Sequence, residues 1–163
     1  EIVMRGYVQR TVFAARGHVA AVLLSSVPFA LLHAGNPNLS VLGLLNIALI
    51  GIFFSLTVIR TGTLWFAAGF HVAWNLTLGP VLAVPVSGMA FTGLFHTSMR
   101  GPDWLTGGGF GIEASVVCTV LFLPLIVAAG IACALRTRFR EPSDEEAARP
   151  LGGRTCNRIP DSV

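Results

Sequence analysis

The chain has 163 residues, of which 53% are hydrophobic and 12% are charged, and its mean hydropathy is +0.72. Soluble domains average about 25% charged residues, so this composition argues against a soluble globular protein and predicts an integral membrane protein. The formal net charge of +3 comes from arginines that cluster outside the apolar segments. That distribution is typical of a membrane surface rather than a nucleic-acid-binding stripe, so we expect membrane lipids as partners and no nucleic acid.

Residues 1–17 are expected to be the end of a helix that begins upstream and continues as a segment at the membrane surface. Glu1 and Arg5 are four residues apart, so they can pair on one helical face. Arg10 and Arg16 add more charge than a lipid-facing span tolerates. The chain begins with Glu1 and shows no signal-peptide pattern, and we interpret it as a fragment whose N-terminal part is missing.

Apolar segments that approach or reach the length of a bilayer predict an all-α fold, a polytopic transmembrane helix bundle. They are residues 18–34, 39–60, 63–80 and 112–135. Pro28 should kink the first segment, and the hydroxyls of Ser25 and Ser26 can satisfy the carbonyls that it frees. Turns around 35–38 and 60–62 predict antiparallel neighbours.

The domain boundary is expected near residue 140. Residues 1–140 are interpreted as one membrane domain, and residues 141–163, which are polar and rich in proline and charge, as a disordered tail. Arginines before residue 18, at Arg60 and at 136–140 are assigned to one side of the membrane. The positive-inside rule makes that side cytoplasmic, and the polar residues described next then lie nearer the other face.

Polar residues within the apolar segments are the candidate functional residues. His71 and Asn75 are four residues apart and share one helical face, and His33 ends an apolar segment. Counting about 1.5 Å per helical residue places Glu1, His33 and His71 in one layer. Polar side chains at bilayer depth are costly without partners, so we expect Glu1, His33, His71 and Asn75 to converge on one cavity.

The chemistry of this set favours hydrolysis. A carboxylate and two imidazoles suit general-base activation of water, and the amide of Asn75 is a suitable oxyanion donor. His33 and His71 are equally plausible ligands for a divalent metal such as zinc, so the pattern leaves both mechanisms open.

Less specific interpretations exist for each residue. An intramembrane histidine can be a hydrogen-bond partner between helices, and Glu1 with Arg5 can be an ordinary surface pair. His18 and His96 have no spaced partner and are expected at the membrane interface. Glu113 opens a helix, where a capping role and a functional role are equally consistent with the sequence. The tryptophans are expected to be interface anchors.

Three motifs carry a resemblance to a known family. Glu1-Ile-Val-Met-Arg5-Gly6 resembles the second half of the E-E-x-x-x-R-G motif of the CPBP intramembrane proteases, the type II CAAX endopeptidase and bacteriocin-processing group. Phe29-x-x-x-His33 and His71-x-x-x-Asn75 are similar to its second and third motifs, in the same order. The resemblance covers roughly residues 1–80, and the stretch 108–113 is similar to one in bacterial members.

The resemblance implies an intramembrane endopeptidase that cleaves membrane-associated peptides, including prenylated CAAX-type substrates, in a bacterial plasma membrane. Glu1 would be the second glutamate of its motif, with the first preceding residue 1. His33 would activate water together with that first glutamate. His71 and Asn75 would hold the oxyanion, and Arg5 would orient the glutamates.

Two other classes of function remain open. One is a non-catalytic membrane scaffold or bacteriocin-immunity protein of the same fold. The other is a small transporter with a proton-coupled His/Glu relay, which would be expected to show an inverted repeat that we do not find in the sequence.

Overall fold

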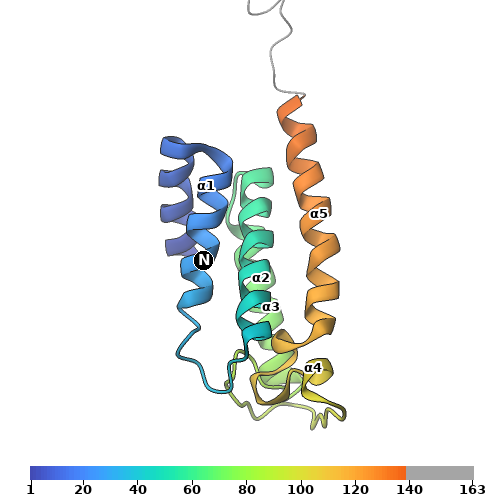
Figure 1. Cartoon of the computed structure of the whole chain (residues 1–163). Helices are drawn as coiled ribbons and strands as arrows, with labels where there is room; N and C mark the ends of the chain where they lie inside the picture. Colours follow the sequence, from blue (N-terminus) through green and yellow to red (C-terminus); the bar gives the residue numbers. More distant parts are fainter. Residues whose placement is uncertain (139–163) are drawn as a thin grey trace, which may run out of the picture.

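The structure is a computed structural model that describes residues 1–138, in which helices are joined by turns and by a long non-helical segment at 82–102 (Figure 1). Its elements in chain order are η1 (Ile2–Val8), α1 (Gln9–Leu31), α2 (Val41–Thr61), α3 (Trp65–Leu76), η2 (Thr77–Val81), α4 (Asp103–Thr106), η3 (Gly108–Phe110), η4 (Ile112–Ala114) and α5 (Val116–Arg138). Apart from an isolated bridge between Val86 and Met89, residues 1–138 contain no β-pairing. The predicted all-α fold is confirmed, while the expected tail 141–163 lies outside the described residues.

Among the described residues, three helical stretches are long and apolar enough to cross a membrane. By length and composition they are Val41–Thr61, Val116–Leu135 and Ile2–Leu31, the last of which Gly17 divides into two arms. These stretches confirm that the chain is built as an integral membrane protein. The fourth expected segment, 63–80, contains the shorter α3 and the π-helical turn η2, which includes Pro80.

The stretch Ile2–Leu31 is a hairpin of two helical arms. Gly17 has φ 77° and ψ −171°, a conformation that interrupts the helix and that glycine adopts without strain. Figure 1 shows the dark-blue arm before this point and the lighter-blue arm after it running in opposite directions. Both arms pack closely against α2 at Gly51. A Cβ added to this glycine would lie 3.0 Å from Arg5 Nη2 on the first arm and 3.1 Å from Ser26 Cβ on the second.

The first arm is not the membrane-surface segment that its arginines predict. Arg5 and Gln9 are almost completely buried, and their side chains donate to backbone carbonyls of α2. The expectation was wrong because charge frequency does not reveal that one helical face finds partners inside the bundle. Ser25 and Ser26 also differ from expectation: Ser25 donates to the Val22 carbonyl, and both hydroxyls hydrogen-bond to Ser55.

Helix α2 is the central element. Ser40 caps its start by accepting from the Gly43 N–H, and Gly62 ends it in a left-handed conformation with φ 76°. Between these caps the helix is almost entirely apolar, so it can be surrounded on several sides. It packs against α1 through a cluster that includes Ile47 and against α5 through one that includes Phe54.

The arginine-bearing ends of the helices meet at one end of the bundle, the upper end in Figure 1. Arg10 Nη2 donates to the Gly62 carbonyl at 3.2 Å, and Cys133 near the end of α5 donates to the Leu56 carbonyl. The loops around His33 and residues 82–115 lie at the opposite end. This arrangement agrees with one-sided placement of the arginines, while the cytoplasmic assignment of that side stays a prediction.

Candidate functional site

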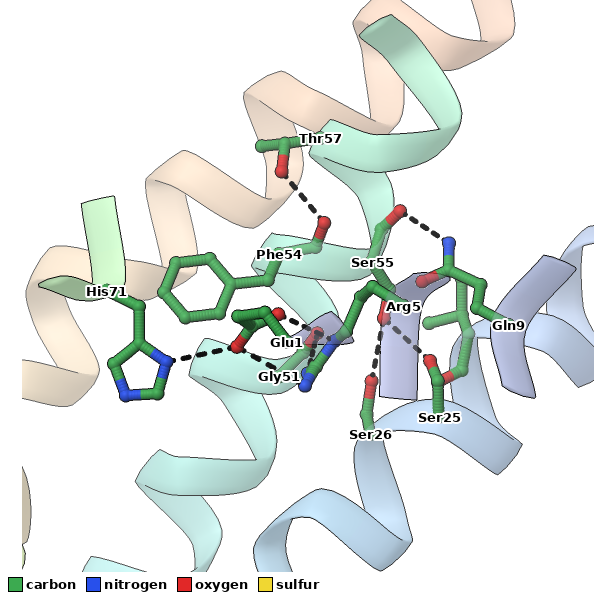
Figure 2. A network of polar contacts seen from close by, with 11 residues as sticks. Glu1, Arg5, Gln9, Ser25, Ser26, Gly51, Phe54, Ser55, Thr57 and His71 are labelled. Carbon is green, nitrogen blue, oxygen red and sulfur yellow. Dashed lines mark hydrogen bonds and ion pairs between the residues drawn. The ribbon is translucent and has the colours of Figure 1, made fainter. Parts of the chain in front are cut away.

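Glu1, Arg5 and His71 form a charged cluster between the N-terminal arm and α3 (Figure 2). His71 Nδ1 lies 3.1 Å from Glu1 Oε1, although the two residues are 70 positions apart in the sequence. Arg5 Nη1 donates to the same Oε1 at 3.5 Å. Arg5 Nε lies 3.4 Å from Glu1 Oε2, at ion-pair distance but outside hydrogen-bond geometry. The i,i+4 pair predicted from the sequence therefore has a third member on another helix.

Arg5 is fully buried and is held from several sides. Its Nη2 donates to the Gly51 carbonyl at 2.9 Å, and its guanidinium carbon lies 4.1 Å from the centre of the Phe29 ring. A buried guanidinium is stable only when it is paired and hydrogen-bonded, and stacking on an aromatic face adds to this. Gly51 permits the approach because it has no side chain. The cation thus fixes the Glu1 carboxylate in place.

Aromatic rings orient His71. The Phe54 ring stacks on the imidazole with centroids 5.6 Å apart and an interplanar angle of 28°. The Phe29 ring meets it edge-on at 5.8 Å. These contacts restrict the rotation of the ring, and the hydrogen bond to Glu1 selects which nitrogen faces the carboxylate.

His33 lies in the turn after α1 and contacts Phe29. Its Nδ1 donates to the Phe29 carbonyl at 2.8 Å, and the His33 and Phe29 rings are 5.0 Å apart. Phe29 therefore contacts both histidines. The sequence indicated Phe29 only as the first residue of the second motif, whereas in the structure its ring contacts both imidazoles and its carbonyl accepts from His33.

The hydrogen bonds define the tautomers of both imidazoles. A carbonyl or an ionised carboxylate oxygen only accepts, so Nδ1 is the protonated nitrogen in His33 and in His71. In the neutral rings, each Nε2 then carries a lone pair. This is the arrangement by which proteins prepare a histidine as a base or a ligand.

Asn75 lies one helical turn beyond His71 on α3. Its Oδ1 is buried and has no hydrogen-bond partner within the part of the chain that the structure describes. The structure thus brings Glu1, Arg5 and His71 into direct contact and links His33 to them through Phe29, whereas within residues 1–138 no side-chain hydrogen bond joins Asn75 to this cluster. A nearby cavity of about 260 Å³ has a different, mostly apolar lining of Phe70, Ala73, Trp74, Thr77 and Leu78.

The donor set does not fit the metal alternative. Zinc sites use at least three protein ligands, and residues 1–138 contain no group of three His, Cys, Asp or Glu side chains placed to hold an ion. Within that part of the chain, the predicted ligands His33 and His71 have no third partner.

A polar layer behind Arg5 was missed by sequence reasoning. Gln9 Nε2 donates to the Ser55 carbonyl at 2.9 Å, and the Ser55 hydroxyl bonds with those of Ser25 and Ser26 at 2.8 and 3.2 Å (Figure 2). The signal was present, because Glu1, Arg5 and Gln9 repeat every four residues on one helical face. This layer fixes the N-terminal arm against α2.

Glu113 neither caps α5 nor joins the charged cluster. Ser115 provides the cap, accepting from the Cys118 N–H at 3.2 Å. The Glu113 carboxylate instead accepts from Trp74 Nε1 and from the backbone and hydroxyl of Ser87. The interface-anchor prediction therefore misses the role of Trp74, which hydrogen-bonds inside the bundle.

The two remaining histidines are away from the cluster. The His18 ring packs edge-on against Phe13 at 4.5 Å, and both His18 and His96 are exposed. Their expected position at an interface agrees with this exposure.

Comparison with protein families matches residues 1–77 to the family described as type II CAAX prenyl endopeptidase Rce1-like. The curated proteins include no match to the chain, and neither do the solved structures. The matched segment contains all five predicted site residues, namely Glu1, Arg5, His33, His71 and Asn75. The part of the chain that carries the candidate site, residues 1–77, is therefore similar to the Rce1-like type II CAAX prenyl endopeptidases, which supports the resemblance seen in the motifs.

Proposed function

We propose that this protein is an intramembrane endopeptidase that cleaves membrane-associated peptides, including prenylated CAAX-type substrates, with water activated by glutamate and histidine. The single observation that carries the proposal is the contact of 3.1 Å between Glu1 and His71. A buried carboxylate against a partly exposed imidazole from a distant part of the chain, with a second histidine that contacts the same Phe29 ring, supports general acid–base hydrolysis. The similarity of residues 1–77 to the Rce1-like family supports the same class of reaction.

His33 is the proposed base. With Nδ1 held by the Phe29 carbonyl, its Nε2 takes a proton from water as the water oxygen attacks the scissile carbonyl. The same nitrogen returns the proton to the leaving amine when the tetrahedral intermediate breaks down. The glutamate that the motif places before Glu1 would share in activating the water.

His71 and Asn75 are the proposed oxyanion donors. When His71 is protonated on both nitrogens, its charge is balanced by Glu1 and its Nε2–H can donate to the developing oxyanion. The side chain of Asn75 supplies an N–H donor from the next turn of the helix.

Glu1 and Arg5 are proposed positioning residues. Glu1 contacts His71 and Arg5 contacts Glu1, so the buried cation acts on the imidazole through the carboxylate. This geometry favours the assignment of Glu1 as the second glutamate of the motif.

The lipid environment supports a membrane-bound substrate. The helices expose many large apolar side chains, as expected for lipid contact, and the bacterial plasma membrane is the location that we propose. A substrate tethered by a lipid would reach the site by diffusing within the bilayer.

The test uses the intact protein in lipid nanodiscs with a farnesylated CAAX peptide and the same peptide without its lipid. Mass spectrometry should detect release of the C-terminal tripeptide from the farnesylated peptide. Preparations of His33→Ala should release none. Two outcomes would contradict the proposal and favour the non-catalytic scaffold or immunity function. One is equal release from both peptides that persists in His33→Ala. The other is that the wild-type protein releases no tripeptide from any lipidated peptide.

A further inference from the structure

Glu113 is a buried carboxylate whose two oxygens are both occupied by neutral donors. Oε1 accepts from Trp74 Nε1 at 3.1 Å, and Oε2 accepts from the Ser87 N–H at 2.6 Å and the Ser87 hydroxyl at 2.7 Å. Only 4% of the residue is exposed, and no ion pair involves it within residues 1–138. A buried charge is retained against its desolvation cost only where its hydrogen bonds are complete.

The backbone at Glu113 is fixed to the central helix. Asn46 of α2 donates through Nδ2 to the carbonyls of Glu113 and Ser115, both at 2.8 Å. The Thr119 hydroxyl donates to Asn46 Oδ1 at 2.6 Å, so both polar atoms of the Asn46 side chain are hydrogen-bonded. Glu113 is therefore anchored to α2, and the groups that it binds are positioned relative to this helix.

One branch from Glu113 leads to the helix of His71 and Asn75. Trp74 directly precedes Asn75 and lies three residues after His71. Its indole also packs on Phe70 in a stacked arrangement. The bond to Glu113 therefore restrains the rotation of α3 about its axis, which determines where the next side chain points.

The other branch leads to the turn of His33. The Ser87 carbonyl accepts from Asn36 Nδ2 at 2.8 Å, and the Asn36 N–H donates to the His33 carbonyl at 3.0 Å. Ser87 has φ 48°, which is costly for a residue with a side chain. Such a conformation persists only when surrounding contacts hold it, and the two hydrogen bonds from Ser87 to Glu113 supply them.

We infer that Glu113 is a positioning residue that sets the distance between the His33 turn and α3 through Ser87–Asn36 on one side and Trp74 on the other. This inference rests on the proposed function for its kinetic consequence, but its structural consequence is independent of that function. A carboxylate that only stabilised the fold would affect unfolding and not the rate of the chemical step. A positioning residue affects kcat, because displacement of a catalytic group by about 1 Å can cost about 10²-fold in rate.

Glu113→Gln is the most informative substitution. The glutamine side chain has one acceptor oxygen and one NH₂ donor, so whichever way it is turned its NH₂ group faces either Trp74 or Ser87. The Ser87 N–H needs an acceptor, so the glutamine oxygen should face Ser87. The NH₂ group then faces Trp74 Nε1, which is itself a donor and cannot accept. The variant should therefore lose the Trp74 bond and keep the Ser87 bonds. We expect kcat to fall about 10- to 100-fold with KM changed less than about threefold, because alignment is lost while binding is retained.

Trp74→Phe removes the same hydrogen bond from its other end. Its loss in kcat should match that of Glu113→Gln, and the double variant should be no worse than either single variant. Trp104→Phe is the matched control, since Trp104 lies exposed on α4 and should leave kcat unchanged. Ser87→Ala tests the branch that leads to the His33 turn. It also keeps the proposal testable if the Glu113→Gln protein does not fold.

A distance measurement tests the positioning role without any activity. Spin labels at Ala34 and Ala73, both exposed, report the separation of the His33 turn and α3 by pulsed electron resonance in a background without the native cysteines. The distance distribution should shift or broaden in Glu113→Gln and in Ser87→Ala, with the unlabelled variants unfolding within a few degrees of the wild-type protein.

The outcomes separate the two proposals. Altered distances with a fall in kcat support the positioning role. Unchanged distances in both variants overturn it, as does an unchanged kcat in an active protein. If the wild-type protein has no peptidase activity that His33→Ala abolishes, the proposed function fails, and the distance distributions alone decide whether Glu113 positions the two elements.

Discussion

Two buried carboxylates in residues 1–138, those of Glu1 and Glu113, differ in what surrounds them. Glu1 lies against a guanidinium and an imidazole, both of which can carry charge. Glu113 lies against an indole N–H, an amide N–H and a hydroxyl, none of which changes charge near neutral pH. The first environment can exchange protons and stabilise a charged intermediate, whereas the second can only hold groups in place. The partners of a buried acid therefore indicate its role better than its burial does.

The largest effect is expected at His33, whose Nε2 is the proposed base of the Glu1 region. His33→Ala should lower kcat by about 10²–10⁴-fold, the usual contribution of a positioned base. His18→Ala and His96→Ala are matched controls, because both histidines are exposed and away from the cluster. Retention of full activity by a folded His33→Ala protein with a defined peptide would show that the second motif is wrongly assigned.

Asn75 should give the next largest effect. Asn75→Ala is expected to lower kcat by about 10²–10³-fold if its amide donates to the oxyanion. Asn75→Asp should be no better, since a carboxylate would repel the developing negative charge. Single-turnover rates with saturating peptide would measure this step directly, and an Asn75→Asp variant as active as the wild type would exclude an oxyanion role.

A smaller effect is expected at Gly51, which lies beneath Arg5. In Gly51→Ala the new Cβ would lie 3.0 Å from Arg5 Nη2 and 3.1 Å from Ser26 Cβ, so helices must separate or Arg5 must move. Overpacking of this kind typically costs about 1–3 kcal/mol. We expect a lower unfolding temperature and a loss of activity of about tenfold. Gly69→Ala is the control, since its Cβ would meet nothing within 4 Å.

The sequence predicted the membrane helices well because unbroken apolar runs and their turn residues carry strong signals. Helix α2 was predicted as 39–60 and found at Val41–Thr61. The Glu1–Arg5 pair was also predictable from its spacing. The contact of this pair with His71 could not be predicted from periodicity, because the spacing of residues within one helix does not indicate which residue of another helix they contact.

Other features depended on tertiary packing. The Gly17 reversal could not be distinguished from an interfacial continuation, since a single glycine is compatible with both. The sequence does not distinguish a capping role for Glu113 from a functional role, because Ser115, two residues later, competes for the capping position. Trp74 was assigned to the membrane interface on residue type, and only the fold brings its N–H to Glu113.

The smallest effect is expected from metal removal. Since the described residues provide no three-ligand set around His33 and His71, peptide cleavage by the purified protein should persist after dialysis against a strong chelator. Activity and bound metal would be measured on the same samples. Loss of activity that zinc restores would contradict this expectation and favour a metal-dependent site completed by residues outside those described.

The central claim is that Glu1 and His71 act as one unit, and a double-mutant cycle tests it most directly. The rates of Glu1→Gln, His71→Gln and the double variant would be measured in the intact protein with one lipidated peptide. If the carboxylate acts through the imidazole, the double variant should be no slower than His71→Gln alone, since groups that act together are not additive. If the two losses instead multiply, Glu1 and His71 contribute independently, and the account of this site is wrong.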